Sequence, residues 1–262
     1  MVKRGSLHIQ KAVVFALVLR EVRGRFSENR LGAFWFVFEP VCYVATLIAI
    51  HAGIRAQKIF PGIDPSLFFI IGTVPFLLYK NIALKGMEAV SANQGLFAYR
   101  QIKPFDCIVA RAIVEFSMMS CVYIVLMFVL GFFGEVDISI RDPLAWLFAL
   151  AIGMALSLGM ALIFCVVAEL LPEVKVFIKL SFWPLYLLSG ALYPLWRLPP
   201  QILSLLEWNP FLHIIDVLRA ATFQHYPKVP GINIVYPAGV TLVILFCGLM
   251  LYRLCRLKMV AI

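Results

Sequence analysis

The chain has 262 residues, of which 63% are hydrophobic and only 14% are charged, and its formal net charge is +9. About a quarter of the residues of a typical soluble domain are charged, and a soluble chain of this length could not bury so much apolar surface. Because the basic residues flank long apolar runs, the positive charge indicates membrane topology and excludes nucleic-acid binding. The composition therefore predicts an all-α, polytopic membrane protein with one transmembrane domain over residues 1–262.

The first predicted element is an amphipathic helix over about residues 7–26. Val13 and Leu17 fall on one side of this helix, and arginines gather towards its end. Such a helix lies in the plane of the lipid headgroups, with its arginines against lipid phosphate. A plain basic anchor that only fixes topology is the alternative. We expect residues 1–33 to form this cytoplasmic, interfacial segment.

The first half of the chain then contains three runs that are long and apolar enough to cross the membrane: residues 34–54, 67–84 and 108–133. Pro40 removes a backbone donor and is expected to kink the first span. The neighbouring Glu39 is costly in lipid, so it should face protein or water. The stretch 85–106 is too long for a hairpin turn and too short for a domain.

The second half contains three further predicted spans: residues 144–168, 176–193 and 236–252. Spans one to five thus occupy residues 34–193, and the sixth span and a cytoplasmic tail occupy residues 236–262. Between them, residues 194–235 hold two apolar runs, 202–206 and 211–223, that are too short to cross. Short periplasmic helices, re-entrant or interfacial, fit these runs best.

The basic residues predict the orientation. Seventeen of the 23 lysines and arginines lie on the side that holds both chain ends and the 85–106 segment, and six lie on the other side. The richer side of a membrane protein is cytoplasmic. Six spans with both termini in the cytoplasm satisfy this rule.

Few residues can carry chemistry in this chain. The sequence contains no G-x-x-x-x-G-K-[ST] phosphate loop and no H-E-x-x-H, and its six cysteines are scattered without a C-x-x-C pair. Disulfides and a metal site are therefore not expected. Glu39 and Glu115 are the only candidates for the buried carboxylate of a proton-coupled carrier. His213, Asp216 and Arg219 share a spacing of three residues, for which a local charge pair is the preferred interpretation.

The most specific pattern lies at the start of the chain: Leu19-Arg20-Glu21-Val22-Arg23, Arg25-Phe26, Arg30-Leu31-Gly32, Trp35 and Glu39-Pro40. It resembles the start of the membrane subunit of ABC-2 type exporters, and is most similar to the permease of capsular-polysaccharide exporters. The resemblance extends over nearly the whole chain. It implies a homodimer that works with two copies of a separate nucleotide-binding ATPase, which would hold the ATP and Mg.

The resemblance also implies a function in the bacterial inner membrane. The capsule branch of the family exports a lipid-linked acidic polysaccharide from the cytoplasm to the periplasm. It passes the glycan to a periplasmic adaptor of the polysaccharide co-polymerase type and an outer-membrane channel. A related permease for O-antigen or teichoic acid is the alternative, and a secondary carrier or membrane scaffold without an ATPase is an alternative from another class.

Nine aromatic residues in or beside the spans are candidates for a sugar path: Trp35, Phe36, Tyr43, Phe76, Tyr79, Trp183, Tyr186, Tyr193 and Trp196. Aromatic faces stack on the apolar faces of sugar rings, and polar ring substituents hydrogen-bond sugar hydroxyls. The resemblance favours this role for spans one and five, which line the pathway in these exporters. For any single residue, packing or an interfacial belt is the simpler interpretation.

Two further groups of residues are candidate functional sites. A lipid-phosphate site or gate is predicted at Arg20, Arg23, Arg25, Arg30 and Glu39, because the planar fork of arginine pairs with phosphate oxygens. An ATPase coupling surface is predicted at Asn93, Leu96, Phe97, Tyr99 and Arg100, where apolar side chains lie beside basic ones. In the alternative, this loop lies on the headgroups with Phe97 and Tyr99 in lipid.

Overall fold

The computed structural model describes residues 6–27, 32–54, 63–99, 101–134 and 136–260. Its elements are all helical: α1 (Ser6–Ser27), α2 (Gly32–Ile54), α3 (Pro65–Met87), η1 (Ser91–Ala98), α4 (Pro104–Phe133), α5 (Pro143–Leu170), α6 (Val174–Leu188), η2 (Leu195–Arg197), α7 (Pro200–Leu206), α8 (Pro210–Thr222) and α9 (Val235–Val260). The predicted all-α fold is therefore confirmed for the described residues, and α1 matches the predicted N-terminal helix to within one residue at each end.

Four of the helices in these described ranges are long and apolar enough to cross a membrane, namely α3, α4, α5 and α9. They correspond to the second, third, fourth and sixth predicted spans. In α2, the described residues give a shorter apolar stretch, Phe38–Ala49. Helix α6 has 15 residues, which is about 22 Å of helix against a hydrocarbon core of about 30 Å.

Helix α6 ends five residues before the predicted end of the fifth span, residue 193. Ser189 closes the last turn, because its hydroxyl donates to the carbonyl of Tyr186 at 2.7 Å. Gly190 then adopts a φ of 70°, a left-handed conformation that glycine reaches without steric cost. The predicted boundary of the fifth span is thus wrong, because this turn is encoded by two small residues within an apolar run.

The starts of the spanning helices are set by capping residues and prolines. The carboxylate of Asp64 accepts hydrogen bonds from the backbone N–H groups of Ser66 and Leu67, and Pro65 begins α3. Asp142 caps α5 in the same way, directly before Pro143. An acceptor at the N-cap and a proline in the first turn suit the unpaired N–H groups of a helix start.

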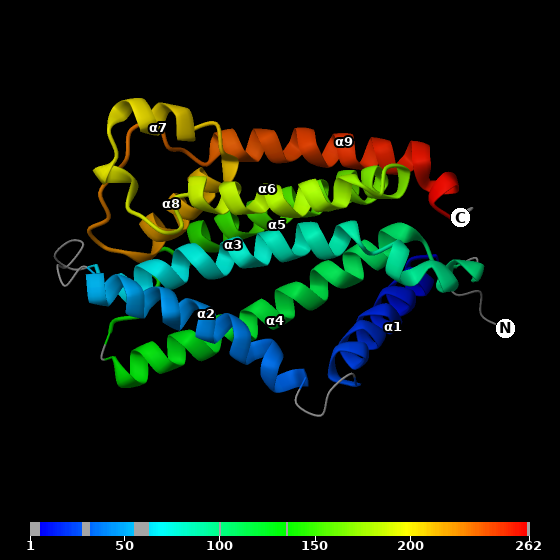
Figure 1. The fold of residues 1–262 in the computed structure, drawn as a ribbon, viewed down its shortest axis with the longest axis horizontal. Coiled ribbons are helices and arrows are strands. Elements are labelled where there is room, and N and C mark those ends of the chain that lie inside the picture. The colour runs from blue at the N-terminus through cyan, green and yellow to red at the C-terminus, as the bar shows by residue number, and fades with distance from the viewer. Residues whose placement is uncertain (1–5, 28–31, 55–62, 100, 135, 261–262) are drawn as a thin grey trace.

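Helix α3 lies at the centre of the fold and packs against α4, α5 and α8 (Figure 1). Helix α9 packs against α5, where Gly159 and Gly248 allow close approach: a Cβ atom at Gly248 would lie 2.8 Å from the Gly159 carbonyl oxygen. Much of the remaining α9 surface, including Leu242 and Phe246, is exposed and apolar, as expected for a helix against lipid. Small residues thus mediate packing in the fourth predicted span.

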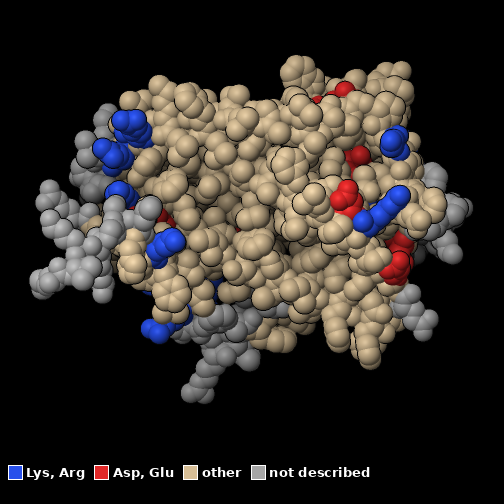
Figure 2. Space-filling model, turned by 180° about the vertical axis from the view of Figure 1, so that it is seen from behind, with Lys and Arg blue, Asp and Glu red and all other residues tan. Residues whose placement is uncertain are grey.

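The two ends of the molecule differ in charge. The start of α1, the end of α9 and η1 lie at one end of the long helices, while α7 and α8 lie at the other (Figure 1). Figure 2 shows Lys and Arg side chains mainly over the first end, whereas Asp and Glu side chains lie mainly over the second, beside a few Lys or Arg side chains. Between the two ends, this face carries few charges, which is the pattern of a membrane-embedded belt.

Three polar residues of α8, His213, Asp216 and Arg219, form contacts beyond this helix. The guanidinium of Arg219 donates to the carbonyl oxygens of Gly190 and Ala191, both at 2.7 Å. Asp216 instead accepts a hydrogen bond from the hydroxyl of Tyr226, and a ring nitrogen of His213 lies 2.8 Å from the Glu207 carbonyl oxygen. Asp216 and Arg219 also attract each other electrostatically, and both interact with Tyr226. The predicted local charge pair is therefore present but not self-contained, because its members also bond to loops outside α8.

Candidate functional site

A cleft of about 470 Å³ lies among α2, α3 and α6. It brings together five residues that the sequence had assigned to two different sites: Glu39, Tyr43, Phe76, Trp183 and Tyr186. Each wall contributes at least one aromatic ring. This cleft is the candidate functional site, because it joins the helices that correspond to the first, second and fifth predicted spans.

The rings of the cleft differ in depth. Phe76 and Tyr186 are buried, and their ring centroids lie 4.9 Å apart. The Tyr186 hydroxyl lies 3.3 Å from the hydroxyl of Thr73 and also interacts with Tyr43. Trp183 is 68% exposed and Tyr43 is 41% exposed. Phe76 and Tyr186 thus form the buried floor of the cleft, whereas Tyr43 and Trp183 are accessible to a ligand.

Helix α3 adds polar residues that the sequence analysis did not assign to a site. Lys80, Asn81 and Lys85 all line the cleft. Lys80 and Asn81 are half-buried, and Lys85 is exposed. The available signal was a lysine inside or next to the apolar run 67–84, but only the packing of α2 and α6 against α3 shows that a cleft lies there.

Three of the predicted path residues lie away from the cleft. Tyr79 is fully buried, stacks on Phe211 at 5.7 Å between ring centroids, and packs against Gly153. Trp196 packs edge-on against Phe68, and Tyr193 is half-buried near it. These three residues therefore pack against other side chains and do not line the cleft.

The remaining path residues are on α2. Trp35 is 54% exposed and lies against Phe34 and Phe38 on the outside of the helix. The side chain of Phe36 lies outside the described residues. Their assignment to a path stays a prediction.

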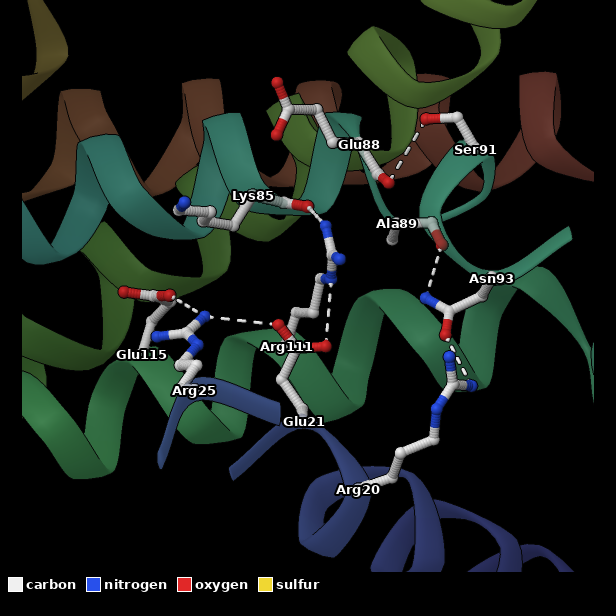
Figure 3. A network of polar contacts seen from close by, with 10 residues as sticks. All are labelled: Arg20, Glu21, Arg25, Lys85, Glu88, Ala89, Ser91, Asn93, Arg111 and Glu115. Atoms are coloured by element: carbon white, nitrogen blue, oxygen red, sulfur yellow. Dashed lines mark hydrogen bonds and ion pairs between the residues drawn. The ribbon is translucent and has the colours of Figure 1, made fainter. Parts of the chain in front are cut away.

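Arg25 of the predicted lipid-phosphate site and Arg111 of α4 have partners inside the protein (Figure 3). Arg25 pairs with Glu115 of α4, whose side chain is 1% exposed, and with Glu21 at 3.3 Å. Arg111 approaches Glu21 at 3.5 Å and donates to the backbone carbonyl of Lys85 at 2.8 Å. These contacts join α1, α3 and α4 at the end of the molecule where α9 ends.

Arg20 connects α1 to the predicted coupling segment. Its guanidinium donates to the side-chain oxygen of Asn93 at 3.0 Å, and Asn93 donates in turn to the carbonyl of Ala89 at 2.7 Å (Figure 3). Asn93 is consequently buried. Arg23 is exposed, whereas Arg30 lies outside the described residues. Arg20 and Arg25 therefore hold α1 against the rest of the fold, and a role in binding lipid phosphate stays a prediction.

The predicted coupling residues differ in exposure. Leu96 and Phe97 are half-buried against an apolar cluster that includes Leu17 of α1. Tyr99 is 60% exposed, and Arg100 lies outside the described residues. Of the described members, Tyr99 is thus the one best placed to meet another protein.

An ion pair joins α6 to the end of α3. The ammonium of Lys179, on α6, lies 2.6 Å from the carboxylate of Glu88, directly after α3. Partial burial opposes ionisation of Glu88, but the hydrogen bond and positive charge of Lys179, together with the charges of Lys85 and Arg111, outweigh it and lower the pKa of this carboxyl. Lys179 is four residues before Trp183, so both side chains share one face of α6.

The fold and the cleft together define a polytopic helical membrane protein with an aromatic and basic crevice between its helices. Residues 12–223 match the family model of the ABC-2 type transporter. The chain therefore belongs to the ABC-2 type transporter family.

Several characterised proteins are similar to this chain over most of their length. The polysialic acid transport protein KpsM of Escherichia coli is 38% identical over 95% of this chain and 96% of its own. The capsule polysaccharide export inner-membrane proteins BexB of Haemophilus influenzae and CtrC of Neisseria meningitidis are 29% and 27% identical, over 84% and 83% of this chain and 82% of each relative. With the apolar helices, these relatives indicate a multi-pass inner-membrane protein.

Proposed function

We propose that this chain is the membrane-spanning subunit of an ATP-driven exporter that moves lipid-linked capsular polysaccharide across the bacterial inner membrane. The observation that carries the proposal is the similarity to the polysialic acid transport protein KpsM over 95% of the chain. A similarity of this extent includes the helices that line the cleft as well as the arginine-rich start. The exposed rings of Tyr43 and Trp183 supply faces on which sugar rings stack.

Energy for export comes from a separate chain in this proposal. The sequence has no phosphate loop, so two copies of an ATPase subunit would bind ATP and Mg and dock at the coupling segment. The membrane subunit works as a homodimer, because the few helices of one chain close poorly around a polymer. A periplasmic adaptor and an outer-membrane channel would receive the glycan.

The proposed topology has six spans, with α2 and α6 as the first and fifth. Both termini, α1 and η1 lie in or at the cytoplasm, and α7 and α8 lie on the periplasmic side. The basic asymmetry of the sequence and the charge distribution in Figure 2 support this orientation. Helix α1 would lie at the interface with its exposed Phe15 towards lipid.

Deletion of the gene tests the function. We expect a lipid-linked capsular glycan to accumulate in the cytoplasm, because the glycan is made there and cannot leave, and mass spectrometry of extracted glycolipids would detect it. The tagged wild-type protein should also retain a nucleotide-binding subunit during purification. Accumulation of an O-antigen or teichoic-acid precursor would show that the exported substrate is not a capsular polysaccharide. A protein that purifies and transports without an ATPase would contradict the proposal as a whole.

A further inference from the structure

We propose that Lys80 and Lys85 of α3 form an anion-binding site in the cleft, which takes the negatively charged group of an amphipathic glycolipid. The inference rests on the proposed export function, and it assigns the charge recognition of that function to two lysines rather than to the arginines of α1. The group bound is a phosphate or a carboxylate, since an ammonium attracts either.

The depth of Lys80 is the first observation. This residue lies seven positions before the end of α3, which is about 10 Å of helix. A cation within a membrane-spanning helix is costly, so such residues face a cavity or a partner and mark substrate pathways. Lys80 is half-buried and lines the cleft beside Asn81. Within the described parts of the chain, it forms no ion pair.

The carboxylates near these lysines are the second observation. Glu88 is paired with Lys179 at 2.6 Å. Glu21 and Glu115 are paired with arginines in the network of Figure 3. The remaining carboxylate is Glu39, which lines the cleft from α2 without a described ion pair to either lysine. Lys85 also attracts Glu88 electrostatically. With Lys80 and Lys85 against Glu39, the lining of the cleft keeps a net positive charge, which favours an anionic ligand.

The orientation of Lys85 is the third observation. Its backbone carbonyl accepts a hydrogen bond from Arg111 at 2.8 Å, which fixes this end of α3. Figure 3 shows the side chain extending away from that bond. Lys85 is exposed and lines the same cleft as Lys80, five residues earlier on α3. The two ammonium groups thus belong to one wall of the cleft, one deep and one near its end.

The chemistry suits a ligand that must move. An ammonium is a compact charge on a flexible stem, without the fixed two-point geometry of a guanidinium. Two such charges along α3 can hold successive anionic groups while Tyr43 and Trp183 contact sugar faces. The side-chain amide of Asn81, between the lysines, can hydrogen-bond a hydroxyl. The site therefore fits an acidic sugar or the phosphate that joins the sugar to its lipid.

Binding measurements on the purified full-length protein test this site without requiring export. The variants are the pair Lys80→Gln with Lys85→Gln, the pair Lys80→Arg with Lys85→Arg, and Lys228→Gln as an exposed control at the opposite end of the fold. One probe is a soluble carboxylated oligosaccharide without lipid, and the other is a nanodisc containing phosphatidylglycerol. Loss of a charge-assisted hydrogen bond should weaken binding about tenfold.

We expect the glutamine pair to weaken binding of at least one probe about tenfold, while the arginine pair and the control bind as the wild type does. Weakening for the oligosaccharide alone identifies a carboxylate site, and weakening for the nanodisc alone identifies a phosphate site. Unchanged binding of both probes by the glutamine pair overturns the site. The same holds if the wild-type protein binds neither probe. Either result leaves the export proposal standing if the glycolipid still accumulates on deletion.

Discussion

Replacing Gly72 by alanine should destabilise the protein by about 2–3 kcal/mol, because the added methyl group has no space in a well-packed core. A Cβ atom at this position would overlap the guanidinium of Arg219 and lie 2.7 Å from the carbonyl oxygen of Ala191. Gly72 lies on α3, and Arg219 lies on α8. The substitution therefore disturbs the contact of α3 with α8 and with the turn after α6.

The effect is large because Arg219 is fully buried and has several partners there. It donates to Gly190 and Ala191, and its guanidinium lies 3.5 Å from the centroid of the Phe68 ring. A shift of this group leaves a buried charge with poorer partners, which is among the costly changes in a folded protein. Arg219→Lys should destabilise the protein as well, since lysine lacks the fork that reaches both carbonyls.

Thermal unfolding of the purified protein in detergent measures this effect. We expect Gly72→Ala to lower the midpoint by roughly 5–10 °C. Gly239→Ala is the matched control, because a Cβ atom at this helical glycine meets nothing within 4 Å. Equal midpoints for Gly72→Ala and Gly239→Ala would contradict the packing described for Arg219.

The second large effect is expected at the coupling segment, where Tyr99→Ala should reduce retention of the ATPase about tenfold. The Tyr99 ring is 60% exposed, and an exposed aromatic beside basic residues is a typical anchor of an interface. Phe97→Ala should instead lower stability together with docking, because its ring is half-buried in the cluster around Leu17.

Co-purification from membranes measures the docking effect, with the membrane subunit quantified in the same sample. Gln94→Ala is the control, since this side chain is exposed on the same segment but is polar. Cysteine at position 94 should react with an impermeant reagent only after the inner membrane is opened, which tests the proposed orientation. Full retention of the ATPase by Tyr99→Ala would show that this ring lies on lipid or in water.

The spans were predictable wherever a run of apolar residues alone determines the helix. Helices α4, α5 and α9 follow from such runs, and their boundaries are marked by prolines or charges. The end of α6 was not predictable in this way. The turn at Gly190 is held by Arg219, a residue 29 positions away in the chain, and no local pattern shows that contact.

The candidate site was predictable in its residue types but not in its grouping. Aromatic residues that suit sugars were found, yet the sequence could not separate Tyr186 in the cleft from Tyr79 in the core. The role of Arg25 was likewise hidden, because its partner Glu115 lies 90 positions away. Lys80 was counted only as a topological charge, since its place in a cleft depends on α2 and α6.

In the proposed function, the exported glycan passes through the cleft among α2, α3 and α6. Site-specific photo-crosslinking during export in cells tests it most directly, with a photoreactive amino acid at Trp183. Phe246 on α9 is the matched control, because both side chains are 68% exposed but only Trp183 lines the cleft. We predict that position 183 captures the glycan only while the ATPase is active and that position 246 captures lipid alone. Equal capture at both positions, or no capture at position 183 while export continues, would contradict the account.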